Sequence, residues 1–171
     1  SKSMPNLVKK RIEFQKNKRV EIHKTIFSPY TASLAHNISL ILPKNLCKSF
    51  FCNSGAESVE GAVKAAYKYH EGKRKYILHS DIAFHGKLIA SSSLSDTQSK
   101  KIFPELLHKK VFKYNDKNSL ERLINETKNR NGSDIYAIII ETYSNSTLTE
   151  ATEDFVKYLR KITEKHKIIL I

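Results

Sequence analysis

The sequence has few of the residues that build disulfide scaffolds and metal clusters. Two cysteines, Cys47 and Cys52, occur among 171 residues without a clustered Cys/His spacing, so neither a secreted disulfide framework nor a zinc module is expected. No apolar run approaches the roughly 18 residues that span a bilayer. The N-terminal residues also lack the apolar block and small-residue cleavage site of a secretory signal. We therefore expect a cytoplasmic protein without a membrane partner.

Acidic residues are scarce relative to basic ones. The chain has 17 Asp and Glu against 30 Lys and Arg, which gives a formal net charge of +13 at pH 7. Such a charge attracts anions, including nucleic acid. The densest basic runs, "KKRIEFQKNKR" and "HEGKRK", lack the glycine-aromatic spacing of an RNA-binding sheet. A lysine-rich solvated surface is therefore the favoured interpretation, and a basic nucleic-acid-binding module is kept as an alternative.

Glycine-rich nucleotide motifs are absent as well, because neither a P-loop ending nor a dinucleotide glycine triplet occurs. The chain does contain "FFCNSGAES" at residues 50–58. Ser54 and Glu57 have the spacing of a capping box, and Gly55 eases the turn into a helix. One interpretation is that this segment only caps the helix. The other notes that a helix N-terminus offers free amides and a partial positive charge, which suit a phosphate group.

Apolar runs and amphipathic stretches alternate along the chain. Helical spacing of apolar residues predicts helices over 32–42 and 56–69, around Leu120–Ile124 and around Phe155–Ile162. Strands are predicted at 48–53, 75–80, 110–115, 134–141 and 167–171. The run "DIYAIIIE" is apolar on both faces, which is typical of a central parallel strand. We expect an α/β fold with a mainly parallel sheet and helices on both faces, over residues 46–171, preceded by a helical segment over 1–45.

Two further segments place polar or aromatic residues at strand ends. "AFHGK" follows a predicted strand and supplies Phe84, His85 and Lys87, and Glu141 ends the apolar run "YAIII". Because the carboxyl ends of parallel strands meet at one edge, ligands bind there in open α/β sheets. Taken singly, a Phe or a His is more often structural, and a strand-end carboxylate is as often solvated as functional.

These motifs together resemble the class III, pyridoxal-phosphate-dependent aminotransferases. The resemblance is carried by "FFCNSGAESVEGAVKAAYKY", "AFHGK" and "IIIE" in this order, and "SPYTASLAHNISLILPKNLCKSFFCNSG" is also similar to the family. The family includes acetylornithine, ornithine, putrescine and 4-aminobutyrate aminotransferases. The resemblance implies a fold type I large domain, pyridoxal phosphate as cofactor and a homodimer. It also implies transfer of an amino group from an amine or amino acid, with diamines and omega-amino acids among the candidates, to a 2-oxo acid.

The resemblance also assigns site residues by position. The cofactor-binding residues that it implies are Ser54, Gly55, Ala56, Phe84, His85 and Glu141. The first three match the phosphate cradle, Phe84 matches the aromatic residue that stacks on the pyridine ring, and Glu141 matches a glutamate close to the cofactor. Lys87 stands where many members have an arginine near the substrate, and a lysine cannot grip a carboxylate bidentately. Lysine at this position is also found in members that resemble the putrescine enzymes, so the resemblance favours a diamine substrate.

The chain departs from the family in two places. After Glu141 the family has proline and glycine-rich residues, whereas "ETYSNSTLTEA" contains neither, so the loop that shapes the substrate pocket differs. The chain ends at "KIILI", where the family continues into the aspartate that pairs with the pyridine nitrogen and the lysine that forms the Schiff base. The resemblance therefore implies a partial large domain that lacks the catalytic lysine and is inactive alone.

Two other interpretations stay open at this point. A non-catalytic or split aminotransferase-like domain would bind an anion or a partner without chemistry. A metal site made of His79, Asp81 and His85 is the least supported, because a strand and a loop would have to converge on the ion and no second shell is evident.

Overall fold

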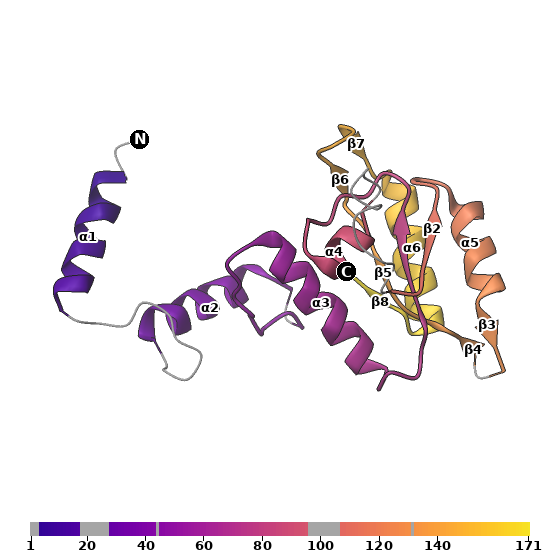
Figure 1. Ribbon diagram of the computed structural model, residues 1–171, viewed down its shortest axis with the longest axis horizontal. Helices are drawn as coiled ribbons and strands as arrows, with labels where there is room; N and C mark the ends of the chain where they lie inside the picture. Colours follow the sequence, from indigo (N-terminus) through magenta and orange to yellow (C-terminus); the bar gives the residue numbers. More distant parts are fainter. Residues whose placement is uncertain (1–3, 18–27, 44, 96–106, 131) are drawn as a thin grey trace. The chain divides into compact units, whose positions relative to one another are not determined.

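The computed structural model describes residues 4–17, 28–43, 45–95, 107–130 and 132–171, and the chain divides into two units, Ser1–Phe51 and Cys52–Ile171 (Figure 1). The first unit contains α1 (Met4–Lys16) and α2 (Pro29–Ile41). Helix α2 was predicted from residue 32 but begins at Pro29, because Ser28 is extended and a proline in the first turn already has a helical φ. None of the helices in the described ranges is long and apolar enough to cross a membrane.

The second unit is built on a four-stranded sheet with the order β2-β1-β5-β8. Its strands are β1 (Tyr76–Ser80), β2 (Lys109–Phe112), β5 (Ile135–Ile139) and β8 (Ile169–Leu170). Every neighbouring pair is parallel, and all residues of β5 are buried. The predicted central parallel strand is therefore confirmed. Short antiparallel pairs join β3 (Lys128–Asn129) to β4 (Gly132–Ser133) and β6 (Tyr143–Ser144) to β7 (Thr149–Glu150).

Helices cover both faces of this sheet. They are α3 (Gly55–Tyr69), α4 (Ile89–Ser93), α5 (Lys117–Glu126) and α6 (Glu153–His166). One apolar cluster joins α3 to the sheet through Val63, Ala66 and Ile77, and a second joins α5 and α6 to the opposite face, where Leu78 lies. Ile77 and Leu78 are consecutive in β1 and enter different clusters, because side chains alternate across a strand. The predicted α/β fold with a mainly parallel sheet and helices on both faces is confirmed.

The strand predicted at 48–53 is wrong. Residues 48–52 have no regular secondary structure, although Phe50 and Phe51 favour strands. Phe50 is 83% exposed, and this segment pairs with no strand in the described part of the chain. Strand propensity reflects packing against neighbouring strands, and without a neighbour the aromatic residues do not form a strand. Helix α3 therefore begins after an irregular segment.

Helix α4 was not predicted, because the stretch "LIASSSLSD" is rich in serine, which does not favour helix interiors. Its amides at Ala90 and Ser91 donate to Oε1 of Glu60 on α3, at 2.8 and 2.9 Å. A carboxylate at a helix N-terminus satisfies free amides and interacts favourably with the helix dipole. The acid that stabilises α4 comes from another helix, so local sequence reasoning could not find it.

Candidate functional site

The N-terminus of α3 forms as its sequence predicts. Ser54 Oγ accepts a hydrogen bond from the Glu57 amide at 3.3 Å, and the Glu57 carboxylate accepts one from the Asn53 amide at 2.7 Å. The glutamate thus reaches back one residue further than in a standard capping box. No acceptor is recorded within the described residues for the amides of Gly55 and Ala56. These amides are therefore available to an anion.

The loop after β1 packs directly on the first turn of α3. Gly86 has a φ of +119°, and a Cβ at this position would lie 2.7 Å from the Ala56 Cβ and 3.2 Å from the Ser91 Oγ. Only glycine tolerates both the backbone conformation and the close approach. The segments "NSGAES" and "AFHGK", which are separate in the sequence, therefore meet at Gly86 and Ala56.

The loop is also attached to the end of β5. The Phe84 amide donates to the Glu141 Oε2 at 2.8 Å, and the Tyr114 hydroxyl donates to the Glu141 carbonyl oxygen at 2.8 Å. The Phe84 side chain is 41% exposed, so its ring can contact a flat ligand. Sequence reasoning missed Tyr114, because a tyrosine after a strand carries no motif of its own.

The side chain of His85 is buried in this loop, and its burial changes its pKa. Its side chain is 7% exposed, and its amide donates to the Ser95 Oγ at 2.8 Å. The imidazole Nε2 has no hydrogen-bond partner among the described residues. Burial lowers the pKa of His85 to about 4, so the ring is neutral at pH 7. A neutral imidazole can donate or accept through Nε2.

Two residues of the weakest alternative, a metal site, make structural contacts, namely His79 and Asp81. His79 is buried in β1, with Nδ1 at 2.9 Å from the Ser80 carbonyl oxygen. Asp81 Oδ1 accepts from the Tyr114 amide at 2.9 Å. No group of three or more His, Cys, Asp or Glu side chains that could hold a metal occurs in the ranges that the structure describes.

The remaining predicted site residue, Lys87, is exposed, and no ion pair is recorded for it within the described part of the chain. The structure therefore brings the α3 N-terminus, Phe84, His85 and Glu141 together but records no contact between Lys87 and any of them. The loop after Glu141 forms the β6-β7 hairpin, in which Leu148 has a φ of +53°. A hairpin without proline or glycine thus occupies the segment that departs from the family pattern.

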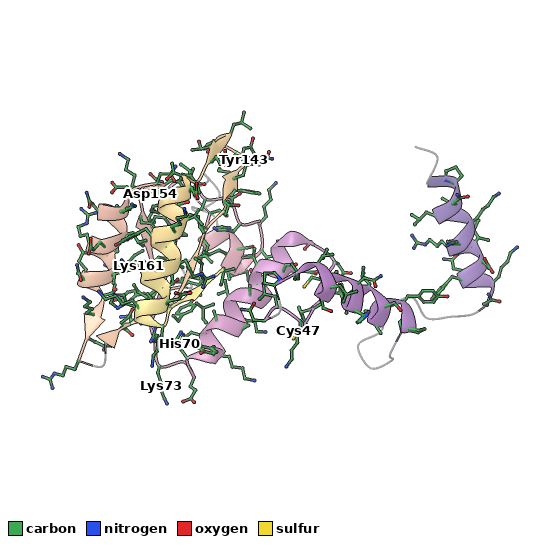
Figure 2. All side chains as sticks on the ribbon, turned by 180° about the vertical axis from the view of Figure 1, so that it is seen from behind. Cys47, His70, Lys73, Tyr143, Asp154 and Lys161 are labelled. Atoms are coloured by element: carbon green, nitrogen blue, oxygen red, sulfur yellow. The ribbon has the colours of Figure 1, made fainter. Side chains whose placement is uncertain are left out.

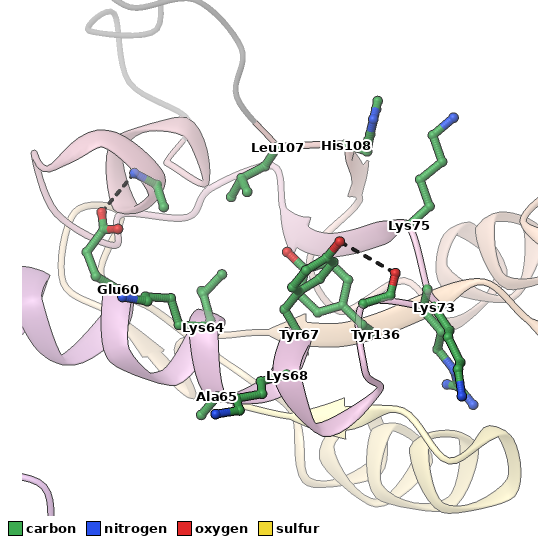
Figure 3. Close-up of a pocket in the computed structure, with 14 residues that line it drawn as sticks. Glu60, Lys64, Ala65, Tyr67, Lys68, Lys73, Lys75, Leu107, His108 and Tyr136 are labelled. Atoms are coloured by element: carbon green, nitrogen blue, oxygen red, sulfur yellow. Dashed lines mark hydrogen bonds between the residues drawn. The ribbon is translucent and has the colours of Figure 1, made fainter.

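A cavity of about 760 Å³ lies away from these residues, between α3 and the N-terminal end of β1 (Figure 3). Its lining includes basic side chains, namely Lys64, Lys68, Lys73, Arg74 and Lys75. Elsewhere on the second unit, exposed lysines such as Lys161 are interspersed with acids such as Asp154 (Figure 2). Lys157 pairs with Glu153 at 2.6 Å, and Arg160 pairs with Glu164 at 3.9 Å. On α6 the positive charge is therefore mixed with negative charge.

Residues 3–171 match the family model for class III aminotransferases. The chain belongs to this family. This aminotransferase chain is 33% identical over 150 residues to the acetylornithine aminotransferase of Prochlorococcus marinus subsp. pastoris. The matched region covers 83% of this chain and 36% of the relative. The family membership predicted from the sequence is confirmed.

Solved structures of transaminases have a similar fold. One, from the marine bacterium Virgibacillus, is 22% identical with a TM-score of 0.82, covering 96% of this aminotransferase chain and 40% of that chain. Another is an amine transaminase from an uncultivated Pseudomonas species in its form bound to pyridoxal phosphate (PLP), which is 18% identical with a TM-score of 0.75. The match covers 88% of this chain and 39% of that chain. The chain thus spans about two fifths of the length of the relatives that it matches. Class III aminotransferases depend on PLP.

Proposed function

We propose that the protein to which this chain belongs is a PLP-dependent transaminase, and that the chain supplies the phosphate end and one face of the cofactor site. One observation supports this most directly: a loop with an exposed aromatic ring is packed on a helix N-terminus with free amides. Gly86 contacts Ala56 in this arrangement, and Phe84 lies two residues before that contact. An aromatic platform beside an anion site suits a flat, phosphorylated ring.

Each residue of the site has a physical role in this proposal. The amides of Gly55 and Ala56, with Ser54 beside them, hold the phosphate, because the helix N-terminus carries a partial positive charge. The ring of Phe84 packs against the face of the pyridine ring. The neutral Nε2 of His85 is free to hydrogen-bond a group from the cofactor or from the rest of the protein. When bound, PLP supplies an aldehyde that links to amines and a ring that withdraws electrons from the adjacent carbon.

The substrates belong to the same proposal. An amine or amino acid is the donor and a 2-oxo acid is the acceptor, in line with family membership. Lys87 offers a compact point charge where an arginine would grip a carboxylate with two hydrogen bonds. Lysine at this position is also similar to the putrescine enzymes of the family, so we infer that a diamine is the preferred amino donor. Comparing a diamine, its omega-amino acid and ornithine as donors for the full-length protein, with one 2-oxo acid as acceptor, tests this preference.

The assembly and location are also proposals. We infer that the full-length protein has fold type I, forms a homodimer and is located in the cytoplasm. The first unit supports a partner surface, because Leu34, Leu40 and Ile41 of α2 are 50%, 69% and 82% exposed. Leu34 and Ile41 are seven residues apart and lie on one face of α2, and exposed apolar residues that lie together commonly mark an interaction surface. Sedimentation of the full-length protein tests the dimer, and a monomer at micromolar concentration would contradict it.

Equilibrium dialysis of the chain against PLP tests the site itself. Gly55→Pro removes one amide donor at the first helical position, where proline is tolerated, and Ser54 already has the extended backbone that precedes a proline. Gly55→Ala is the matched control, since a Cβ at Gly55 meets nothing within 4 Å. We expect Gly55→Pro and Phe84→Ala each to weaken binding by about tenfold, and Gly55→Ala to leave it unchanged.

Three outcomes separate the alternatives. Equal PLP affinity in all four proteins would refute the proposed site. PLP binding without transaminase activity of the full-length protein would favour the non-catalytic alternative. Binding of a nucleic acid that falls steeply with salt and is unaffected by Gly55→Pro and Phe84→Ala would favour the basic module.

A further inference from the structure

We propose that Glu141 is a positioning residue that acts on the cofactor site through the backbone of Phe84 and does not itself bind the cofactor. This inference deepens the proposed function and rests on it for the identity of the ligand. It revises the role that the resemblance gives to Glu141, which is that of a residue close to the cofactor.

The first observation is the hydrogen bond itself. Glu141 Oε2 lies 2.8 Å from the Phe84 amide nitrogen and joins the end of β5 to the loop after β1. A bond to an ionised carboxylate is about twice as strong as one between neutral groups. Glu141 is half-buried but the bond itself is exposed, so solvent screens part of its charge.

The second observation is that Glu141 is itself held in place. The Tyr114 hydroxyl, from the segment after β2, donates to the Glu141 carbonyl oxygen at 2.8 Å. The Tyr114 amide donates to Asp81 Oδ1 at 2.9 Å, and Asp81 directly follows β1. The ends of three neighbouring strands, β2, β1 and β5, are therefore linked by side chains at one edge of the sheet.

The third observation concerns the residues on either side of Phe84. Ala83 is 2% exposed and His85 is 7% exposed, whereas Phe84 is 41% exposed. The His85 amide is bound to Ser95 Oγ at 2.8 Å. The Phe84 amide has the Glu141 carboxylate as its acceptor, so the loop is anchored on both sides of the point where the exposed ring leaves it.

Because its loop is anchored in this way, the Phe84 ring is already oriented before a ligand binds. Stacking contributes to affinity only after the ring has lost its freedom to move, and a preformed loop lowers that cost. Glutamine at position 141 keeps an acceptor oxygen, whereas alanine removes it. Glu141→Gln and Glu141→Ala should therefore have different effects on the hydrogen bond to the Phe84 amide.

Hydrogen exchange at the Phe84 amide tests the contact without any cofactor. We expect Glu141→Ala to accelerate exchange of this amide by about tenfold and Glu141→Gln to change it by less than about threefold. Glu150→Ala, which removes an exposed carboxylate from the β6-β7 hairpin, is the control and should leave the rate unchanged. An unchanged rate in Glu141→Ala would overturn the proposal.

A double-mutant cycle on PLP affinity tests whether Glu141 acts through Phe84. We expect Glu141→Ala to weaken binding by about tenfold in the wild-type chain and by less than about twofold when position 84 is alanine. Equal weakening in both backgrounds would mean that Glu141 touches the cofactor directly, which would overturn the proposal. If the wild-type chain binds no PLP, the proposed function of this chain fails, and the exchange measurement alone then confirms or refutes the role of Glu141.

Discussion

The buried imidazole of His85 makes the stability of the protein depend on pH. Burial lowers its pKa from 6.5 to about 4 in the folded chain, whereas the unfolded chain keeps the ordinary value. Below pH 6.5 the unfolded chain takes up a proton that the folded chain does not, so the unfolded state is stabilised as the pH falls. At about 1.4 kcal/mol for each pKa difference of one, the loss of stability is about 2 kcal/mol at pH 5 and reaches about 3 kcal/mol below pH 4.

Urea unfolding of the wild-type chain and of His85→Asn at pH 7 and pH 5 measures this effect. Asparagine is polar and does not ionise, so the variant lacks the pH-dependent contribution. We expect the wild type to lose about 2 kcal/mol more than the variant between the two pH values. The packing cost of the substitution cancels in this comparison, as do the contributions of His70 and His166, whose pKa values are also lowered by burial. Equal losses in both proteins would refute the reasoning.

Three further substitutions test the fold around the site and the sheet. Gly86→Ala should lower the free energy of unfolding by at least about 2 kcal/mol, because the φ of Gly86 is +119° and the new Cβ would lie 2.7 Å from the Cβ of Ala56. Gly55→Ala is the control and should change the free energy of unfolding by less than about 0.5 kcal/mol. Ser54→Ala removes the N-cap acceptor of α3 and should cost about 1 kcal/mol, read as a lower thermal midpoint. Arg74→Met leaves three main-chain carbonyl oxygens at the start of β5 and the end of α6 without their donor, which should cost about 2 kcal/mol in urea unfolding. A stability within about 0.3 kcal/mol of the wild type would contradict the prediction in the last two cases.

Periodicity alone predicted the elements that carry most of the core. Leu120, Leu123 and Ile124 repeat at helical spacing and are buried on α5. The run "DIYAIIIE" is apolar on both faces and became β5, which is covered on both faces. The segment 48–53 has the composition of a strand but no neighbour with which to pair, and its aromatic residues remain exposed. Pattern-based prediction failed there because it reads the residues and not their partners.

The sequence by itself determined the four strands of the sheet and the helices α3, α5 and α6, the layered α/β fold, the capped start of α3 and membership of the class III aminotransferases. These features depend on local spacing, on side chains within one turn of each other and on motifs in a fixed order. The tertiary structure alone decided that Gly86 lies against Ala56, that Glu60 caps α4 and that Glu141 holds the Phe84 amide. Phe84 and Glu141 meet because parallel pairing places the ends of β1 and β5 at one edge of the sheet in a particular register. Contacts between distant residues depend on strand order and register, which local spacing does not encode.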